Sequence, residues 1–422
     1  MIHKLITTFA LLFLLSAAAQ SQQRVLIPMD GSQTNHLKAY GVIFNHLVEG
    51  ETGQWLLNYR GGSFLTTATS DIVRKSRVRN VRIDVISESE ANQIISEVEQ
   101  PNVNMSAVNL QTVPKIAVYS PPQAMPWDDA VTLALDYAEV PYETIYDEEV
   151  LNGDLDQYDW LHLHHEDFTG QFGKFYGMYR NASWYISEVN YLEGVAEQFG
   201  YQKVSDLKLD VVLEIKDYIG NGGFLFAMCS GTNTFDMALA AELIDIVPTE
   251  IDGDPVDSNV NERLDYNSTL AFENFSVITD PNIYQHGDID VEVDLNRISE
   301  SLDYFSLFEF SAKWDPVPAM LTQNHVSSIP GFYGQSTAFQ SDKVKSNTVV
   351  LAESSGRDQV KYIHGNYGQG TFTFYAGHDP EDYTHRVGDP PTDLSLHTNS
   401  PGYRLILNNI LFPAAEKKKR ET

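Results

Sequence analysis

The sequence predicts an α/β protein built on a doubly wound, mostly parallel sheet. Short apolar segments alternate with helical segments from residue 115 onward, an alternation that is typical of parallel strands joined by crossover helices. The clearest strand is Phe224–Met228, which follows a helical segment at Leu207–Ile219 and the glycine pair Gly222–Gly223. We expect this strand to be parallel and central in the sheet.

The chain before residue 113 has the pattern of a smaller N-terminal α/β unit, residues 20–112. A short strand at Val25–Pro28 precedes a helix at Thr34–Val48, and further strands and a helix follow as far as Val98. Residues 101–112 are polar and show no periodicity, so we expect a linker there.

The second unit spans residues 113–415. Apolar segments predict strands at Lys115–Tyr119, Tyr142–Tyr146 and Trp160–His164. Residues 248–346 are acidic and rich in turn formers, so we expect an insertion there, after which strands return at Val360–Ile363 and Thr371–Tyr375. Residues 416–422 are a short basic tail, most simply a solvated chain end.

Composition limits the possible partners. The chain has 422 residues and a formal net charge of −30, which argues against a nucleic-acid partner because phosphate binding requires clustered Lys and Arg. Cys229 is the one cysteine, so no disulfide within the chain is possible. Stability must therefore come from packing, which this length permits.

The first 19 residues have the pattern of a signal peptide. Leu5–Leu15 is an apolar run too short to span a membrane, and Ala17–Ala19 supplies small residues before an expected cleavage at Gln20. No later apolar run approaches membrane-spanning length. We therefore expect an exported protein, periplasmic or extracellular, that is soluble after cleavage.

Cys229 lies on a strand–turn–helix segment, the context of a nucleophile elbow. The small residues Ala227 and Gly231 flank it where larger side chains would clash in a strained turn, and Ser230 starts the next helix with a backbone N–H that can face an oxyanion. The alternative is a buried core cysteine without chemistry, because free Cys is among the most buried residue types.

His378 follows the strand Thr371–Tyr375, and acids come one and three residues later at Asp379 and Glu381. An imidazole that takes a thiol proton and a carboxylate that orients the ring are what a cysteine nucleophile needs. The alternative is a structural histidine at a strand end.

The segment His164, His165, Glu166 and Asp167 follows the strand at Trp160 and should reach the same edge of the sheet as Cys229. We expect these residues to form a ligand-binding or oxyanion loop beside the cysteine, with Gly231 at its border. Two alternatives stay open, a metal site and structural hydrogen bonding.

The acidic run at Asp252–Glu262 could bind calcium, although it does not fit an EF-hand and a solvated loop is the simpler interpretation.

The segment from Ala227 to Gly231 resembles the nucleophile elbow of class I glutamine amidotransferases, and His378 through Glu381 resembles their His-Pro-Glu segment. The resemblance implies a flavodoxin-like fold over residues 113–247 and 347–413, with Cys229 as nucleophile, His378 as base and Glu381 as the orienting carboxylate. Ala227 replaces the first elbow glycine, and Asp379 is inserted between the histidine and Pro380. The C-terminal part, from Gly368 through Glu381, is also similar to trehalose-utilisation-type proteins, which share the fold but lack the cysteine.

The whole chain resembles exported bacterial proteins that carry the label asparagine synthetase B. The residues do not support synthetase chemistry, because Ile2 rather than a cysteine follows Met1 and no Ser-Gly-Gly-x-Asp-Ser nucleotide loop is present.

Two hypotheses from different functional classes follow. The first is an exported cysteine-dependent amidohydrolase, similar to a glutamine amidotransferase, that acts on a small-molecule amide or glycan-type substrate through a thioester. The second is a non-catalytic protein of the same fold that binds carbohydrate or peptidoglycan fragments. We expect neither a cofactor nor a metal, and the oligomeric state stays open.

Overall fold

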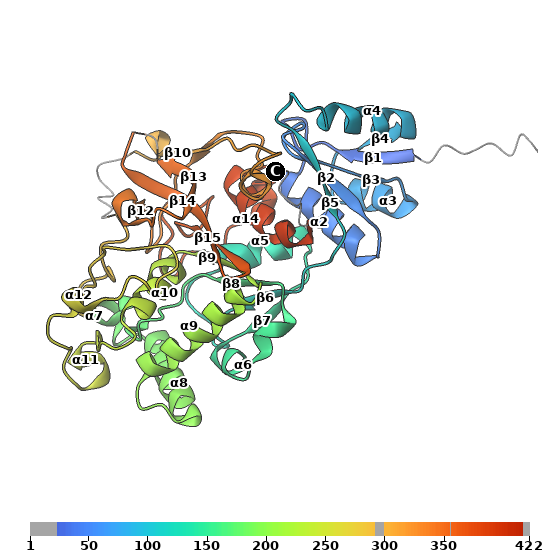
Figure 1. Cartoon of the computed structure of the whole chain (residues 1–422). Coiled ribbons are helices and arrows are strands. Elements are labelled where there is room, and N and C mark those ends of the chain that lie inside the picture. Colours follow the sequence, from blue (N-terminus) through green and yellow to red (C-terminus); the bar gives the residue numbers. More distant parts are fainter. Residues whose placement is uncertain (1–22, 292–298, 355, 417–422) are drawn as a thin grey trace, which may run out of the picture.

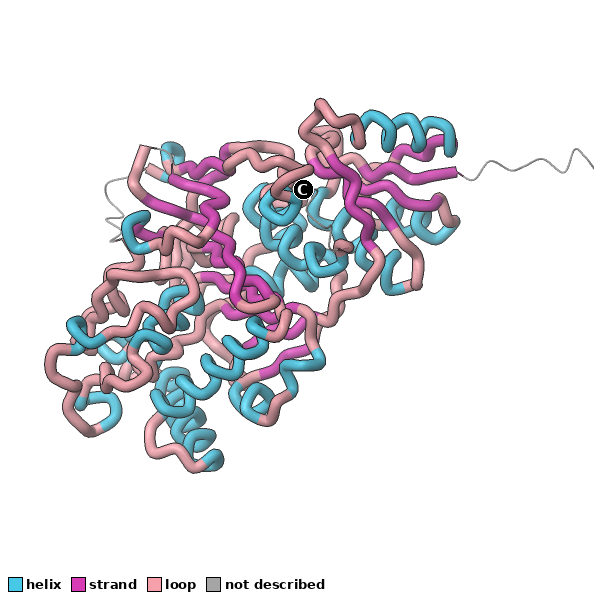
Figure 2. The backbone as a smooth tube through the Cα atoms, viewed as in Figure 1, coloured by secondary structure: helices cyan, strands magenta, loops and turns pink. Residues whose placement is uncertain are grey.

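The computed structural model describes residues 23–291, 299–354 and 356–416. The expected signal peptide and all but the first residue of the basic tail lie outside the described residues. Within them, the chain forms two sheets, which Figures 1 and 2 show as separate sets of strands.

The N-terminal sheet has five strands in the order β4-β1-β3-β2-β5, and each neighbouring pair is antiparallel. Its strands are β1 (Gln23–Ile27), β2 (Gly53–Leu57), β3 (Ser63–Thr67), β4 (Asp84–Ser87) and β5 (Ser106–Leu110). The helices of this part are α2 (His36–Val48), α3 (Ser70–Val78) and α4 (Glu88–Val98). Ser87 caps the N-terminus of helix α4, where its hydroxyl and the Glu90 carboxylate form a capping box.

The expected linker at residues 101–112 is wrong in part, because it contains the edge strand β5. Val108 and Leu110 of β5 are buried in the core, whereas Ala107 and Asn109 beside them are only partly buried. The segment was missed because its apolar positions alternate over only five residues between polar ends.

The second sheet has ten strands, in the order β11-β10-β13-β14-β15-β9-β8-β6-β7 with β12 paired to β14. The strands are β6 (Ile116–Tyr119), β7 (Glu143–Ile145), β8 (Trp160–Leu163), β9 (Phe224–Met228), β10 (Tyr304–Leu307), β11 (Ser328–Pro330), β12 (Phe339–Gln340), β13 (Val349–Ser354), β14 (Gln359–Tyr367) and β15 (Gly370–Tyr375). β9 lies between β8 and β15 and is parallel to both.

This topology corrects the predicted fold class. The sheet is not a doubly wound, mostly parallel flavodoxin-like sheet. Each pair of neighbouring strands along β11-β10-β13-β14-β15 is antiparallel. Only the part from β15 through β7 is parallel.

Two local features explain the difference. Tyr367 pairs with Gly370, so only two residues join β14 to β15, and a two-residue turn can join only antiparallel strands. Gly368 adopts the positive φ of 58° that such a turn requires. The segment expected to be an insertion also supplies β10, β11 and β12 to the sheet.

The remaining helices are α5 (Ala130–Ala138), α6 (Asp147–Leu151), α7 (Tyr176–Tyr179), α8 (Ser183–Phe199), α9 (Val204–Gly220), α10 (Ser230–Ala240), α11 (Thr249–Asp252), α12 (Val260–Arg263), α13 (Pro316–Leu321) and α14 (Pro401–Leu411). Helices α2, α5 and α14 pack together between the two sheets (Figure 1). Phe226 and Met228 of β9 join their core, whereas Leu225 and Ala227 face the opposite core with α8, α9 and α10. Both faces of β9 are therefore buried, which fits its uninterrupted apolar sequence.

None of the helices in the described ranges is long and apolar enough to cross a membrane.

Candidate active site at the carboxyl edge of the parallel strands

Three parallel strands end at one edge of the large sheet and deliver the candidate residues there. His164 follows β8, Cys229 follows β9, and Gly377 and His378 follow β15 shortly after its last residue. Because the carboxyl ends of neighbouring parallel strands meet at one edge, residues far apart in the sequence come together.

Cys229 has a strained backbone, with φ 46° and ψ −134°, at the turn from β9 into α10. Such a conformation is rare for a residue with a Cβ and is concentrated at functional sites. Gly231 allows the tight turn, because its N–H donates to the His164 carbonyl at 2.9 Å and a Cβ there would lie 3.1 Å from the same oxygen. The sequence prediction of a strained turn flanked by small residues therefore agrees with the backbone.

Backbone N–H groups surround the Cys229 sulfur. The Gln335 N–H donates to Sγ at 3.2 Å. Burial raises the pKa of the Cys229 thiol, and the backbone N–H groups of Ser336, Gln335 and Ser230 act in the opposite direction. The sulfur is therefore a thiol in the resting protein, and backbone N–H groups are directed at it.

The loop that carries Gln335 and Ser336 was not expected at the site from the sequence. The backbone of this loop passes close to the thiol, since a Cβ built on Gly334 would lie 3.1 Å from Cys229 Sγ. The two glycines at positions 331 and 334 were the available signal, because closely spaced glycines indicate a close approach of backbone to another group.

The His378 side chain lies in a cluster of histidine rings. It stacks on His385 with ring centroids 4.1 Å apart, and its centroid lies 4.7 Å from that of His164 and 4.5 Å from that of His165. Neither ring nitrogen of His378 has a hydrogen-bond partner among the described residues. Burial and the neighbouring imidazoles hold the pKa of His378 well below its ordinary value, so the ring is neutral.

The two expected carboxylate partners of His378 lie elsewhere. Glu381 Oε2 is 2.8 Å from Nδ1 of His397, and Asp379 Oδ1 accepts the Glu381 N–H at 2.8 Å. Among the described residues, no carboxylate orients the His378 ring and no hydrogen bond joins it to the Cys229 thiol. The structure brings Cys229 and His378 to one cavity without assembling the hydrogen-bonded triad that the resemblance implies.

Asp128 and Asp129 contact the histidines in β8 and directly after it. Asp129 Oδ2 lies 3.2 Å from Nε2 of His162 and 3.3 Å from Nδ1 of His164. The Asp128 carbonyl lies 2.8 Å from Nε2 of His165. Burial would raise the pKa of Asp129, but His162 and His164 hold it well below its ordinary value. Sequence reasoning missed these two acids, which precede α5 about 35 residues before the histidines.

Glu166 and Asp167 have different environments. Glu166 accepts the His164 N–H at 3.0 Å, and burial raises the pKa of its carboxyl to about 8. Asp167 accepts the N–H groups of Thr169 and Gly173, each at 2.8 Å. Asp167 therefore fixes the loop, whereas Glu166 is a buried carboxylic acid near the histidines.

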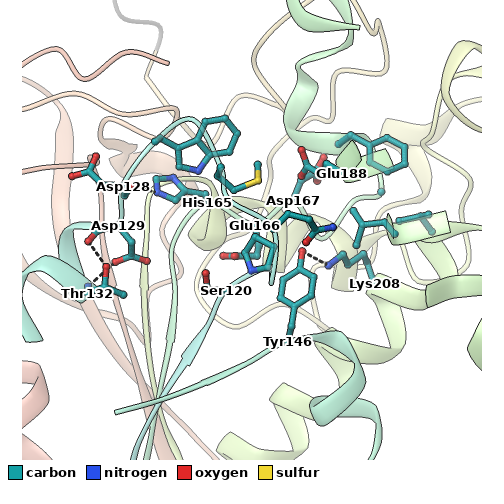
Figure 3. A pocket seen from close by; sticks show the side chains of 18 residues that line it. Ser120, Asp128, Asp129, Thr132, Tyr146, His165, Glu166, Asp167, Glu188 and Lys208 are labelled. Carbon is teal, nitrogen blue, oxygen red and sulfur yellow. Dashed lines mark hydrogen bonds between the residues drawn. The ribbon is translucent and has the colours of Figure 1, made fainter. Parts of the chain in front are cut away.

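Two adjoining cavities meet at Trp127 and His165. One, of about 310 Å³, is lined by Cys229, His378 and Gln335 among others. The second, of about 250 Å³, is shown in Figure 3 with Glu166, Glu188, Lys208 and Tyr146 around it. Together they offer a polar, partly aromatic space next to the thiol.

The proposed calcium alternative at the acidic run has a simpler explanation. Lys203 Nζ lies 2.5 Å from Asp245, 3.0 Å from Asp252 and 2.7 Å from Asp254. A lysine ammonium thus already lies among these carboxylates.

Comparisons with known proteins place the chain in no family. No family model matches it, and no curated protein matches it. Among solved structures, cytoplasmic protein STM3548 of Salmonella typhimurium has 14% identity and a TM-score of 0.35, over 72% of this chain and 100% of the other. Cytoplasmic protein STM1381 of the same species has 14% identity and a TM-score of 0.36 over the same shares. Gan42B, a GH42 β-galactosidase from G. stearothermophilus, has 10% identity and a TM-score of 0.30, over 63% of this chain and 28% of the other. Likeness at this level carries no argument about function.

Proposed function

We propose that this protein is a cysteine-dependent hydrolase that cleaves a small-molecule amide through a thioester on Cys229. The observation that carries the proposal is the strained backbone of Cys229 at a strand-to-helix turn, with backbone N–H groups directed at its sulfur. This is the arrangement that nucleophile elbows use, and the resemblance to class I glutamine amidotransferases points to the same residue.

The proposed reaction balances with water as the co-substrate. A base takes the thiol proton while sulfur attacks the amide carbon, and the C–N bond then breaks as the amine leaves with that proton. Water hydrolyses the thioester and restores the thiol, releasing a carboxylic acid. As sulfur attacks, negative charge develops on the carbonyl oxygen of the substrate. The backbone N–H groups of Ser230, Gln335 and Ser336 can stabilise this charge.

His378 is the base that we propose. Its ring is neutral, and neither of its nitrogens has a hydrogen-bond partner within residues 23–291, 299–354 and 356–416, so it can accept a proton. It lines the same cavity as Cys229. The thiol and the ring must approach further when substrate binds, since catalytic hydrogen bonds often tighten only in the complex.

The cavity beside Glu166 and Glu188 supports a polar substrate. Its walls combine carboxyl groups, the Lys208 ammonium and the aromatic rings of Trp127 and Tyr146 (Figure 3). Carboxyl groups and aromatic faces also suit hydroxyl-rich ligands, so a glycan-type substrate fits as well as a simple amide.

The same cavity favours a second candidate, a non-catalytic protein that binds carbohydrate or peptidoglycan fragments. In that case the thiol has no chemical role. Reactivity of the folded protein separates the two candidates, because a catalytic cysteine must be accessible to a small electrophile whereas an inert core cysteine is not.

The direct test is modification of the native protein with iodoacetamide, located by peptide mass spectrometry. We expect Cys229 to be carbamidomethylated in the folded protein, with EDTA present so that no bound metal ion shields the thiol. A Cys229→Ser variant should lose any amide hydrolysis found with a substrate panel while keeping its far-UV spectrum. Modification that requires denaturant would overturn the hydrolase proposal in favour of the binding protein.

We also infer that the chain is exported after cleavage before Gln20. The support is the pattern of residues 1–19 alone. Amino-terminal sequencing of the secreted or periplasmic protein should begin near Gln20, and recovery of intact Met1 in the cytoplasm would contradict export.

A further inference from the structure

Three imidazoles converge at the edge of the sheet with no hydrogen-bond partner for several of their nitrogens. One ring nitrogen each of His164, His165 and His378 lies within 4.8 Å of the others. His164 is 1% exposed and His378 is 6% exposed. Nitrogens of both rings lack a hydrogen-bond partner among the described residues, although buried polar groups are normally satisfied.

The surrounding contacts leave one nitrogen lone pair on each ring. His165 Nε2 faces the Asp128 carbonyl at 2.8 Å, and because a carbonyl only accepts, Nε2 carries the proton and Nδ1 is free. His164 Nδ1 lies 3.3 Å from Asp129 Oδ2, and neither ring nitrogen of His164 has a hydrogen-bond partner among the described residues. A proton on Nδ1 would face this carboxylate and leave the Nε2 lone pair for a ligand. Neither ring nitrogen of His378 has a hydrogen-bond partner in the part of the chain that the structure describes.

This is the outer shell that metal-binding histidines have in proteins. A ligating histidine usually donates its other ring N–H to a carboxylate or a backbone carbonyl, which fixes the ring and its tautomer. The Asp128 carbonyl is such a partner of His165, and the Asp129 carboxylate lies 3.3 Å from His164 Nδ1. Three neutral imidazoles suit zinc and similar divalent ions, with a fourth position left open.

We propose that His164, His165 and His378 bind a divalent transition-metal ion of the zinc class, and that this ion inhibits the Cys229 thiol by occupying its base. The metal site stands on the geometry of the three rings. The inhibition rests on the proposed function, because only there does His378 accept the thiol proton. One ring nitrogen cannot both hold the metal and take that proton, so the two states exclude each other.

Binding is measured first, on the purified full-length protein stripped with EDTA and dialysed. Titration calorimetry with zinc chloride should give one ion per chain. The cobalt(II) form should show the visible absorption of a four-coordinate centre, which a loosely held ion does not give.

Variants test the ligands and their outer shell. His164→Gln should abolish the cobalt spectrum, and Asp129→Asn should weaken zinc binding by about 10–100-fold. His364→Gln is the matched control, since His364 is also buried but contacts Thr373 rather than the cluster. Because the wild-type titration needs no variant, misfolding of His164→Gln would leave the proposal testable.

Iodoacetamide modification of Cys229 then tests the inhibition. We expect zinc to slow it in the wild type and in His364→Gln, and EDTA to restore it. His164→Gln should lose the zinc effect, which excludes direct capture of zinc by the thiol.

The outcomes separate the two proposals. Absence of stoichiometric zinc and of the cobalt spectrum would overturn the metal site and leave the hydrolase proposal standing. Metal binding with a thiol that stays inert in EDTA would support the site but overturn the hydrolase and the inhibition with it. Faster modification or hydrolysis with zinc would overturn inhibition.

Discussion

Gly334 lies between the Cys229 sulfur and the backbone of His378. A Cβ added at Gly334 would lie 3.1 Å from Cys229 Sγ, 2.8 Å from the His378 amide nitrogen and 2.9 Å from the Gly377 carbonyl carbon. Only a residue without a side chain fits here, so this glycine sets the distance between the loop over the thiol and the strand end that carries His378.

Gly334→Ala should therefore displace the loop that carries Gln335. Because two of the three close contacts are to backbone atoms, the clash cannot be relieved by a side chain, and we expect the free energy of unfolding to fall by about 1–3 kcal/mol. Urea unfolding followed by circular dichroism measures this. Gly31→Ala is the control, since a Cβ at Gly31 meets nothing within 4 Å. Equal stability of the two variants would contradict the close approach.

The buried ion pair of Lys208 and Asp147 should stabilise the folded protein beside the smaller cavity, which Lys208 lines. Lys208 Nζ lies 2.8 Å and 2.9 Å from the two Asp147 oxygens, and the residues are 2% and 0% exposed. Lys208→Met leaves a buried, unpaired carboxylate, so the free energy of unfolding should fall by about 3–5 kcal/mol.

Adding Asp147→Leu to Lys208→Met should recover much of that loss, because it removes the unpaired charge. Lys216→Met, on the same helix, is the control and should have a small effect, since the partly exposed Lys216 ammonium donates to the Ser268 carbonyl and lies over the Tyr367 ring without a carboxylate partner among the described residues. A double variant less stable than Lys208→Met would refute this account of the pair.

Glu188 should make stability depend on pH. Burial raises the pKa of its carboxyl to about 7, partly offset by Lys208. The folded pKa lies above the unfolded value of 4.5, so the contribution of Glu188 is full below about pH 4.5 and is lost as pH rises through about 7. Glu188→Gln should therefore raise the free energy of unfolding, relative to the wild type, more at pH 8 than at pH 4. The difference between the two pH values should be on the order of 2 kcal/mol.

Denaturant unfolding at the two pH values measures this difference. Glu193→Gln, on the exposed face of the same helix, should show no such pH-dependent gain. A Glu188→Gln variant with the wild-type pH dependence would exclude an ionisation coupled to folding at this position.

The sequence was most informative where local rules decide the structure. The apolar run at Phe224–Met228, the small residues beside Cys229 and the following helical pattern predicted the strand, the strained turn and the helix. The antiparallel part of the sheet was not predicted. It depends on the two-residue turn at Gly368 and on short strands within an acidic segment that lacks apolar periodicity.

The partners of the site residues were also beyond the sequence. Proximity in the chain suggested Glu381 as the partner of His378, but Glu381 contacts His397. Gln335 reaches the thiol from 106 residues away. Contacts of this kind depend on how distant loops pack. The glycines at positions 331 and 334 indicate a close approach of the backbone, but they do not identify the group that is approached.

The measurement that tests the central claim most directly is the pH dependence of iodoacetamide modification at Cys229 in EDTA. The account predicts a modification midpoint above the free-thiol pKa of about 8.5 in the folded wild type, because burial raises the pKa of the Cys229 thiol. The midpoint should be higher still in His378→Ala, because that variant lacks the ring that accepts the thiol proton. Glu381→Gln should keep the wild-type midpoint, because that carboxylate contacts His397 rather than His378. A midpoint that is the same in wild type and His378→Ala, or a thiol that reacts only after unfolding, would contradict it.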